Sequence, residues 1–256
     1  MNVLFVSGID TDIGKTYATG IIAKSLMQQG VSVITQKLVQ TGVSIHPDTG
    51  DMNIADDIIT HRHLMGIPLQ PCDLDFTTCA HRYEKPASPH LATRLSGEVL
   101  DPELITNATK RLQAEYDLVL LEGAGGLLVP ITEQLLILDY IAAQGYPIIL
   151  VTSGRLGSIN HTLLSLEAIK ARGLSVHSVI YNHIHDNADN TDAEIANSTV
   201  DFLQNYLAAN YPRAYWVQIP SLKNKVSVNT ETLNTEMLNT ETLSENGCLS
   251  LPKGFI

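Results

Sequence analysis

The chain is poor in cysteine and has no long hydrophobic run. Its three cysteines, Cys72, Cys79 and Cys248, are odd in number and lack the C-x₂-C spacing of a zinc ribbon, so we expect reduced thiols in a cytoplasmic protein. No segment approaches the roughly 18 consecutive apolar residues that a membrane span requires. The β-like run just after Met1 has no basic region before it, so we expect no signal peptide.

Positive charge is also scarce. The 256 residues include 16 Lys and Arg against 27 Asp and Glu, which gives a formal net charge of −11. This balance argues against nucleic acid or an anionic membrane surface as a partner. It does not exclude ATP, because a loop of backbone amides with one lysine makes its own local positive site.

A Walker-type phosphate loop is the most informative motif. An apolar run over 3–6 leads into Gly8–Thr16, with the sequence GIDTDIGKT, and a helical apolar pattern follows. Five residues separate Gly8 from Gly14, so Ile9 takes the first position of the strict G-x₄-G-K-[ST] pattern. Backbone N–H groups of such a loop bind phosphates, Lys15 can reach the β- and γ-phosphates, and the Thr16 hydroxyl can ligate Mg²⁺. The motif predicts a nucleoside triphosphate site.

Apolar strand-like runs alternate with helical patterns over about two hundred residues. This alternation predicts a single-domain α/β protein of the P-loop NTPase fold, with a mostly parallel sheet of about seven strands and helices on both faces. The expected strands include 3–6, 31–37, 118–121, 148–151, 176–181 and 215–219, and the expected helices include 15–29, 52–64, 102–115, 135–144, 159–172 and 192–207. The stretch 66–89 has no clear period, and a loop of this length is expected to be functional or partly structured.

Polar residues follow several of the expected strands. Ligands of open parallel sheets bind outside the carboxyl ends of the strands, so these segments should surround one crevice. Lys37 would aim a second cation at the γ-phosphate, and Glu122, ending a buried strand before a glycine-rich turn, is a Walker-B-like carboxylate for Mg²⁺. Either Asp56 or Asp57 could complete the metal site, although adjacent acids on a helix are commonly just a solvated face.

Together these segments resemble the dethiobiotin synthetase family. The resemblance rests on motifs that run in family order over about 220 residues: GIDTDIGKT at 8–16, KLVQTG at 37–42, PASPH at 86–90, EGAGG at 122–126, LGSINH at 156–161, Asn182, and Ile219-Pro220. It implies an ATP- and Mg²⁺-dependent cyclo-ligase of biotin biosynthesis that converts 7,8-diaminopelargonic acid and CO₂ into dethiobiotin. The implied intermediates are a carbamate and a carbamic–phosphoric anhydride.

The resemblance also implies roles for individual residues. Lys37, Lys15 and Thr11 would be catalytic, Thr16, Asp56 and Glu122 would hold Mg²⁺, and the family is a homodimer in which the helix start near 156–160 reaches across to the substrate carboxylate. The implied ATP-binding residues are Asp12, Ile13, Gly14, Lys15, Thr16, Tyr17, Asp56, Glu122, Gly123, Ala124, Gly125, Asn182, His183 and Pro220. The implied substrate-binding residues are Thr41, Leu156, Gly157, Ser158 and Asn160.

Some residues depart from the family pattern. Ile9 replaces a threonine, Leu38 replaces the proline that commonly follows the lysine, and Thr41 replaces a serine while keeping its hydroxyl. The pattern also ends after Pro220, which puts the loop that closes over the adenine in doubt.

Two other function classes compete with the ligase. Partitioning and septum-positioning ATPases share a similar sheet and a dimeric site, but they carry an extra lysine early in the loop, and none stands between Gly8 and Gly14. A small-molecule kinase would yield a stable phosphorylated product without requiring CO₂.

Residues 223–256 form a region of different composition. A polar pentapeptide repeat occupies 229–243, and its period of five matches neither helix nor strand, so we expect a low-complexity tail that the fold does not need. Docking onto a neighbouring subunit is the alternative. The pairs His61/His63 and His183/His185 are interpreted as surface or loop histidines, with His183 near the base pocket, because residues i and i+2 of a helix do not share a face.

Overall fold

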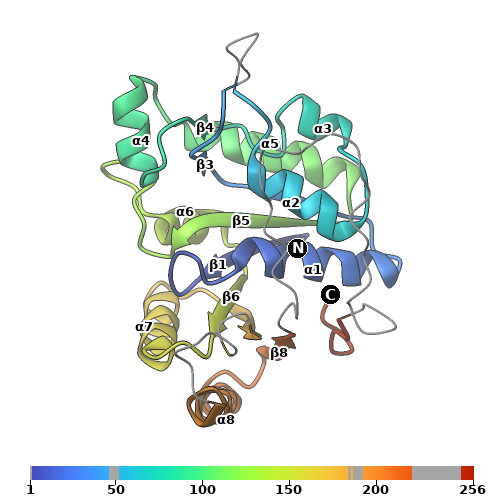
Figure 1. The fold of residues 1–256 in the computed structure, drawn as a ribbon, viewed down its shortest axis with the longest axis vertical. Helices are drawn as coiled ribbons and strands as arrows, with labels where there is room; N and C mark the ends of the chain where they lie inside the picture. The colour runs from blue at the N-terminus through green and yellow to red at the C-terminus, as the bar shows by residue number, and fades with distance from the viewer. Residues whose placement is uncertain (1, 46–51, 184–185, 187–192, 221–248) are drawn as a thin grey trace.

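The structure, a computed structural model, describes residues 2–45, 52–183, 186, 193–220 and 249–256. A six-stranded parallel sheet in the order β2-β5-β1-β6-β7-β8 forms its centre, and β3 pairs with β4 separately (Figure 1). The strands are β1 Val3–Gly8, β2 Val33–Lys37, β3 Gln40–Thr41, β4 Arg82–Tyr83, β5 Leu118–Gly126, β6 Ile148–Ser153, β7 Val176–Asn182 and β8 Tyr215–Ile219. The helices are α1 Lys15–Gln28, α2 Asp56–Met65, α3 Pro71–Leu74, α4 Pro89–Ser96, α5 Pro102–Glu115, α6 Ile137–Gln144, α7 Ser158–Ala171 and α8 Ala193–Asn210.

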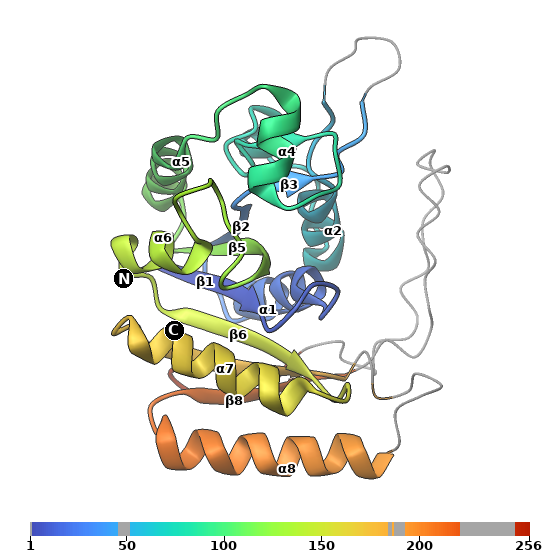
Figure 2. The same ribbon diagram turned by 90° about the vertical axis from the view of Figure 1, so that its left-hand side faces the viewer.

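Both faces of the sheet are buried, as the apolar strand runs predict. Along β1, Val3 and Phe5 join a core cluster with α5, α6 and α7, whereas Leu4 and Val6 join a cluster with α1 on the opposite face. The fold class is therefore confirmed, with six strands in the main sheet where about seven were expected. Figure 2 shows α7 and α8 running side by side next to the β6–β8 half of the sheet.

Some element boundaries differ from those predicted. Helix α2 begins at Asp56, four residues later than expected, because Met52 pairs with Ile45 in an isolated antiparallel bridge and two acids in the first turn favour a start at Asp56. Helix α4 was not predicted, although Ser88 at its N-cap and Pro89 in its first turn are a recognisable start signal.

A buried ion pair holds α2, α3 and β2 together beside the crevice. Arg62 of α2 donates from Nε and Nη2 to the two carboxylate oxygens of Asp73 in α3, both at 2.8 Å, and from Nη1 to Thr35 Oγ1 of β2 at 2.7 Å. The stretch 66–89 thus contains a short helix and a short strand, and Thr78 in it accepts a hydrogen bond from the Lys37 backbone N–H at 2.7 Å. These contacts hold α2 against the strand that carries Lys37.

The last eight residues pack against the domain. Leu251 and Phe255 are buried in the same cluster as α1, His177 Nε2 lies 2.7 Å from the Phe255 carbonyl oxygen, and Tyr215 Oη donates to the Gly254 carbonyl. The expectation of a tail that the fold does not need therefore does not extend to residues 249–256. The pentapeptide repeat at 229–243 lies outside the described residues, as does Cys248.

Two further expectations concern membranes and cysteines. No helix within the described parts of the chain is both long enough and apolar enough to span a bilayer. Cys72 and Cys79 are free, buried thiols, as predicted for those two positions.

Candidate active site

The phosphate loop connects the end of β1 to the start of α1. Asp12 and Gly14 both adopt positive φ, 56° and 84°, which turns successive backbone amides toward a common concavity. A Cβ built on Gly8 would lie 2.5 Å from Ile13 Cγ2, so the loop closes tightly on Gly8 rather than on Ile9. The free N–H groups of the first turn of α1 add the positive end of the helix dipole at the same place.

The loop borders a cavity of about 740 Å³. The predicted residues that line it are Thr11, Asp12, Gly14, Lys15, Thr16, Lys37, Thr41, Glu122, Ala124 and Gly125. Asp57 lines it as well, together with Pro86, Ser88 and Pro89 of the motif before α4. Residues from five separate parts of the chain thus meet near the carboxyl ends of β1, β2 and β5, where the rule for parallel sheets predicts a ligand.

Lys37 and Glu122 form the charged centre of this cavity. Lys37 Nζ donates to Glu122 Oε1 at 2.8 Å and to the Gly123 carbonyl oxygen at 3.1 Å, and it also contacts the Asp57 carboxylate. Burial alone would lower the pKa of Lys37, but Glu122 and Asp57 outweigh it and raise that pKa above its ordinary value. Burial would likewise raise the pKa of Glu122, yet Lys37 and His61 lower it, so the pair stays ionised.

Lys15 is the second cation of the cavity. Its side chain is only 7% exposed, and its Nζ donates to the Asp10 carbonyl oxygen at 3.1 Å. Burial lowers the pKa of Lys15, and repulsion from Lys37 lowers it further. Two ammonium groups close enough to repel each other make a cavity that favours a polyanion such as a triphosphate.

Of the two adjacent acids at the start of α2, Asp57 rather than the predicted Asp56 lies at the cavity. Asp57 lines the cavity and contacts Lys37, whereas Asp56 is exposed at the start of α2 and is not among the residues that line it. Thr16 Oγ1 donates to Glu122 Oε1 at 3.0 Å, which brings a hydroxyl and a carboxylate together. Hydroxyl and carboxylate oxygens are ligands that Mg²⁺ accepts alongside phosphate oxygens, so the donor set of Thr16, Glu122 and Asp57 fits that ion.

His61 was wrongly interpreted as a surface or loop histidine. It is fully buried on α2, and its Nε2 lies 2.7 Å from Glu122 Oε2. The i,i+4 spacing between Asp57 and His61, which puts both on one helix face, is a signal in the sequence that the i,i+2 argument about His63 does not address. His63 itself is exposed, and His183 is half-exposed in the turn that follows β7.

Several residues predicted to bind ATP on its adenine side contact the phosphate loop or the first turn of α1. Asn182, fully buried at the end of β7, donates from Nδ2 to the carbonyl oxygens of Ile13 and Gly14, both at 3.4 Å. Tyr17 Oη lies 3.5 Å from the Pro220 carbonyl oxygen. His183 Nε2 lies 2.8 Å from Gln218 Oε1, and its Nδ1 contacts Asp186. The Ile13 side chain is buried in the core, so Ile13 can offer only its backbone to a bound phosphate.

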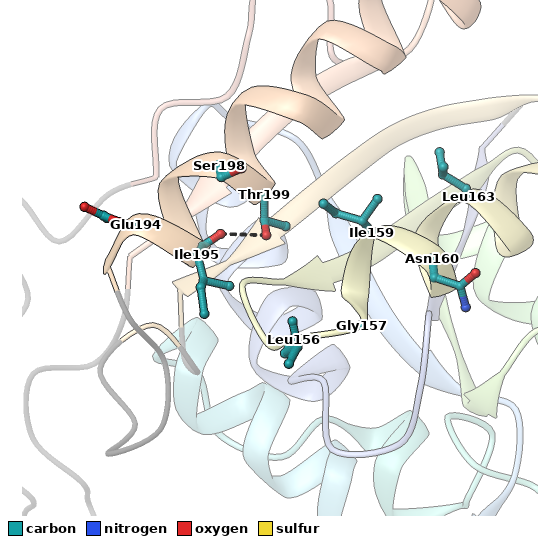
Figure 3. Close-up of a pocket in the computed structure, with 9 residues that line it drawn as sticks. All are labelled: Leu156, Gly157, Ile159, Asn160, Leu163, Glu194, Ile195, Ser198 and Thr199. Carbon is teal, nitrogen blue, oxygen red and sulfur yellow. Dashed lines mark hydrogen bonds between the residues drawn. The ribbon is translucent and has the colours of Figure 1, made fainter.

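Three of the predicted substrate residues lie elsewhere. Leu156, Gly157 and Asn160 line a different cavity of about 750 Å³ between the N-terminal ends of α7 and α8 (Figure 3). Leu156 is 82% exposed, whereas Ser158 is buried with its Oγ 3.4 Å from Ser153 Oγ. Within one chain, Thr41 alone of the predicted substrate residues shares the cavity of Lys15 and Lys37.

An ion pair connects the two regions. Arg155, in the turn before α7, contacts Asp10 of the phosphate loop. The hydrogen bond from Arg155 lowers the pKa of Asp10, and a backbone hydrogen bond from Thr11 lowers it too. Neither residue was predicted as functional. The contact joins the phosphate loop to the turn that carries Leu156 and Gly157.

Comparisons with known proteins agree with the motif evidence. A family model described as an AAA domain matches residues 2–210. The ATP-dependent dethiobiotin synthetase BioD 2 of Haemophilus influenzae is 56% identical over 70% of this chain and 90% of its own length. The corresponding protein of Pasteurella multocida is 50% identical over 82% of this chain and 93% of its own, and BioD of Chlorobaculum tepidum is 50% identical over 77% of each.

Among solved structures, a ParA family ATPase from Chlorobium tepidum aligns with a TM-score of 0.49 and 16% identity, over 87% of this chain and 85% of that chain. A likeness of that strength carries no functional argument. The sequence relatives are at least 50% identical over most of their length, which shows the family. This chain belongs to the family of ATP-dependent dethiobiotin synthetases.

Proposed function

We propose that this protein is a dethiobiotin synthetase that uses ATP and Mg²⁺ to close 7,8-diaminopelargonic acid and CO₂ into the cyclic urea of dethiobiotin. The observation that carries the proposal is the gathering of Lys15, Lys37 and Glu122 around one cavity beside the phosphate loop. A ligase that activates a carboxylated amine by phosphorylation needs positive charge where two anions, carbamate and triphosphate, must approach each other.

The reaction has three steps. One amine of the substrate adds to CO₂ and loses a proton, giving a carbamate. A carbamate oxygen attacks the γ-phosphorus of ATP, the bond to the β-phosphate oxygen breaks, and ADP leaves. The second amine then attacks the carbonyl carbon of this mixed anhydride, expels phosphate and loses a proton as the ring closes.

The proposed roles follow from where the side chains lie. Backbone amides from Asp12 to Thr16 bind the phosphates, and Lys15 and Lys37 neutralise the charge that develops around the transferred phosphoryl group. Mg²⁺, held by Thr16, Glu122 and Asp57, would supply further charge neutralisation on the phosphate oxygens. Thr11 and Thr41, which line the same cavity, orient the substrate amines with their hydroxyls.

The substrate carboxylate is proposed to bind at the second cavity of a partner subunit. Leu156, Gly157 and Asn160 lie at the start of α7, where unpaired N–H groups favour an anion. Their distance from the cavity of Lys37 within one chain is expected if the active site is completed across a homodimer interface. The large exposed side chain of Leu156 suits such an interface.

Coupled product release tests the proposal. ADP and phosphate should form only when diaminopelargonate and bicarbonate or CO₂ are both present, and omission of either should stop turnover. ATP hydrolysis that is indifferent to the diamine would contradict the ligase. A stable phosphorylated product formed without CO₂ would indicate a kinase instead.

A further inference from the structure

Helix α2 contacts the buried ion pair at two points. Asp57 contacts Lys37, and His61, one turn further along the same helix face, lies with Nε2 2.7 Å from Glu122 Oε2. The four side chains therefore form a continuous row, Asp57–Lys37–Glu122–His61, in which the helix supplies both ends and the strands supply the middle.

The two oxygens of Glu122 have different partners. Oε1 accepts from Lys37 Nζ at 2.8 Å and from Thr16 Oγ1 at 3.0 Å, on the side of the cavity. Oε2 is contacted by His61 alone among the hydrogen bonds of the described residues. Since Glu122 stays ionised beside Lys37, its oxygens only accept, so the His61 Nε2 must carry the donated proton.

The bond to Glu122 is also the one polar contact of His61 among the described residues. Its side chain is fully buried, and its Nδ1 finds no hydrogen-bond partner there. A histidine that only filled space would be expensive at such a site, because burying a polar ring costs free energy that an aliphatic side chain avoids. The contact with Glu122 is thus the feature of His61 that a Leu or Met could not reproduce.

We propose that His61 is a positioning residue that fixes the rotation of the Glu122 carboxylate, so that Oε1 stays directed at Thr16 and Lys37. Without the donor on Oε2, the carboxylate can turn both oxygens toward the Lys37 ammonium and weaken its contact on the Thr16 side. This inference rests on the proposed function, because it presupposes that Mg²⁺ and ATP bind beside Glu122. Groups that orient a metal-binding carboxylate typically contribute 10–100-fold to metal affinity or activity.

Two nearly isosteric variants separate the hydrogen bond from packing. His61→Gln keeps an N–H donor, whereas His61→Met has a similar length and no donor. The ATP dissociation constant of each variant is measured by calorimetry in Mg²⁺ and in EDTA. The constant in EDTA divided by the constant in Mg²⁺ reports the metal-dependent part of binding. His63→Met, at the exposed position two residues further along the same helix, is the matched control.

We expect H61M to lower that ratio by about 10–100-fold while leaving ATP affinity in EDTA unchanged, and H61Q to stay within about threefold of the wild type. The catalytic rate should follow the same order, and His63→Met should match the wild type throughout. An H61M ratio equal to that of the wild type would overturn the inference, as would an equal loss in H61Q and H61M. If H61M does not fold, H61Q alone decides: a ratio near that of the wild type supports the donor role, and a large loss contradicts it.

The same measurement keeps the two proposals apart. A wild-type protein that shows no Mg²⁺-dependent ATP binding would contradict the proposed function itself. A wild type with strong Mg²⁺ dependence that H61M retains would contradict only the positioning role of His61.

Discussion

Lys37 and Glu122 occupy paired positions on the neighbouring strands β2 and β5, and their side chains form an almost completely buried ion pair of 2.8 Å. Such a pair is costly to bury, and its two charges offset each other only while both are present. The cavity therefore holds a carboxylate and an ammonium group ready-ionised beside the phosphate loop. The stability of this region and the chemistry of the cavity therefore depend on the same ion pair and on the residues that contact it.

Removal of Lys37 should affect turnover and stability separately. Lys37→Ala should keep ATP binding through the phosphate loop but reduce turnover by about 10²–10³, as for a lost charge stabiliser. It should also lower the free energy of unfolding by about 3–5 kcal/mol, because Glu122 is left as an uncompensated buried charge. Turnover is measured by ADP release, and stability by urea denaturation.

The double variant Lys37→Ala/Glu122→Gln is the control. With both charges removed, it should recover most of the lost stability but none of the turnover. Restored turnover in the double variant, or unchanged turnover in the single one, would remove Lys37 from the mechanism.

Acid stability should depend on Glu122. Because Lys37 and His61 lower its pKa in the folded state, the unfolded chain binds a proton at Glu122 first as the pH falls. Below the ordinary glutamate pKa of 4.5, stability should therefore fall with acidification, and Glu122 should contribute a slope of about 1.4 kcal/mol per pH unit. In denaturation series between pH 3 and pH 6, Glu122→Gln should reduce the slope of unfolding free energy against pH by that amount below pH 4.5 and leave it unchanged above. An identical slope in the two proteins would show that Glu122 is not held ionised.

The adjacent acids of α2 should differ sharply in function. Asp57→Asn removes a carboxylate that lines the cavity and contacts Lys37, so it should weaken Mg²⁺-dependent ATP binding and turnover by about 10-fold or more. Asp56→Asn changes an exposed side chain and should leave both within about threefold. Steady-state kinetics at varied Mg²⁺ concentration distinguish the two. The reverse order would restore Asp56 as the metal acid.

The C-terminal residues should stabilise the domain. Phe255 is 3% exposed and packs edge-on against the ring of His177, so Phe255→Ala should lower the free energy of unfolding by about 3–5 kcal/mol. Lys253→Ala, two residues away and exposed, should change it by less than about 0.5 kcal/mol. Thermal or urea unfolding measures both. Equal stability of the two variants would mean that residues 249–256 do not dock in solution.

The sequence predicted the parts of this site that depend on strand order and short motifs. Lys15, Lys37 and Glu122 each follow or end an apolar strand, and the rule for parallel sheets was enough to bring them to one edge. It did not predict the burial of His61. The i,i+4 spacing places His61 on the same helix face as Asp57, but the packing of that face against Glu122 is a tertiary feature. The choice between Asp56 and Asp57 stays open in the sequence for a similar reason, because one residue of helical register is 100° of rotation.

The short strands β3 and β4 and the docking of the last residues were not predicted, for local reasons. Strands β3 and β4 are two residues long, too short to show a period. The docking of Leu251 and Phe255 follows a polar repeat whose composition predicted a tail, and only their contact with α1 and β7 distinguishes these last residues from it.

The transfer of labelled carbon tests the ligase most directly. The purified protein is supplied with ATP, Mg²⁺, diaminopelargonate and ¹³C-bicarbonate, and the products are examined by mass spectrometry. We expect dethiobiotin with one ¹³C atom in its ureido carbonyl, formed in equal amount to ADP and lost in Lys37→Ala. Formation of ADP without any labelled cyclic urea would contradict the assignment of this cavity to carboxylation and ring closure.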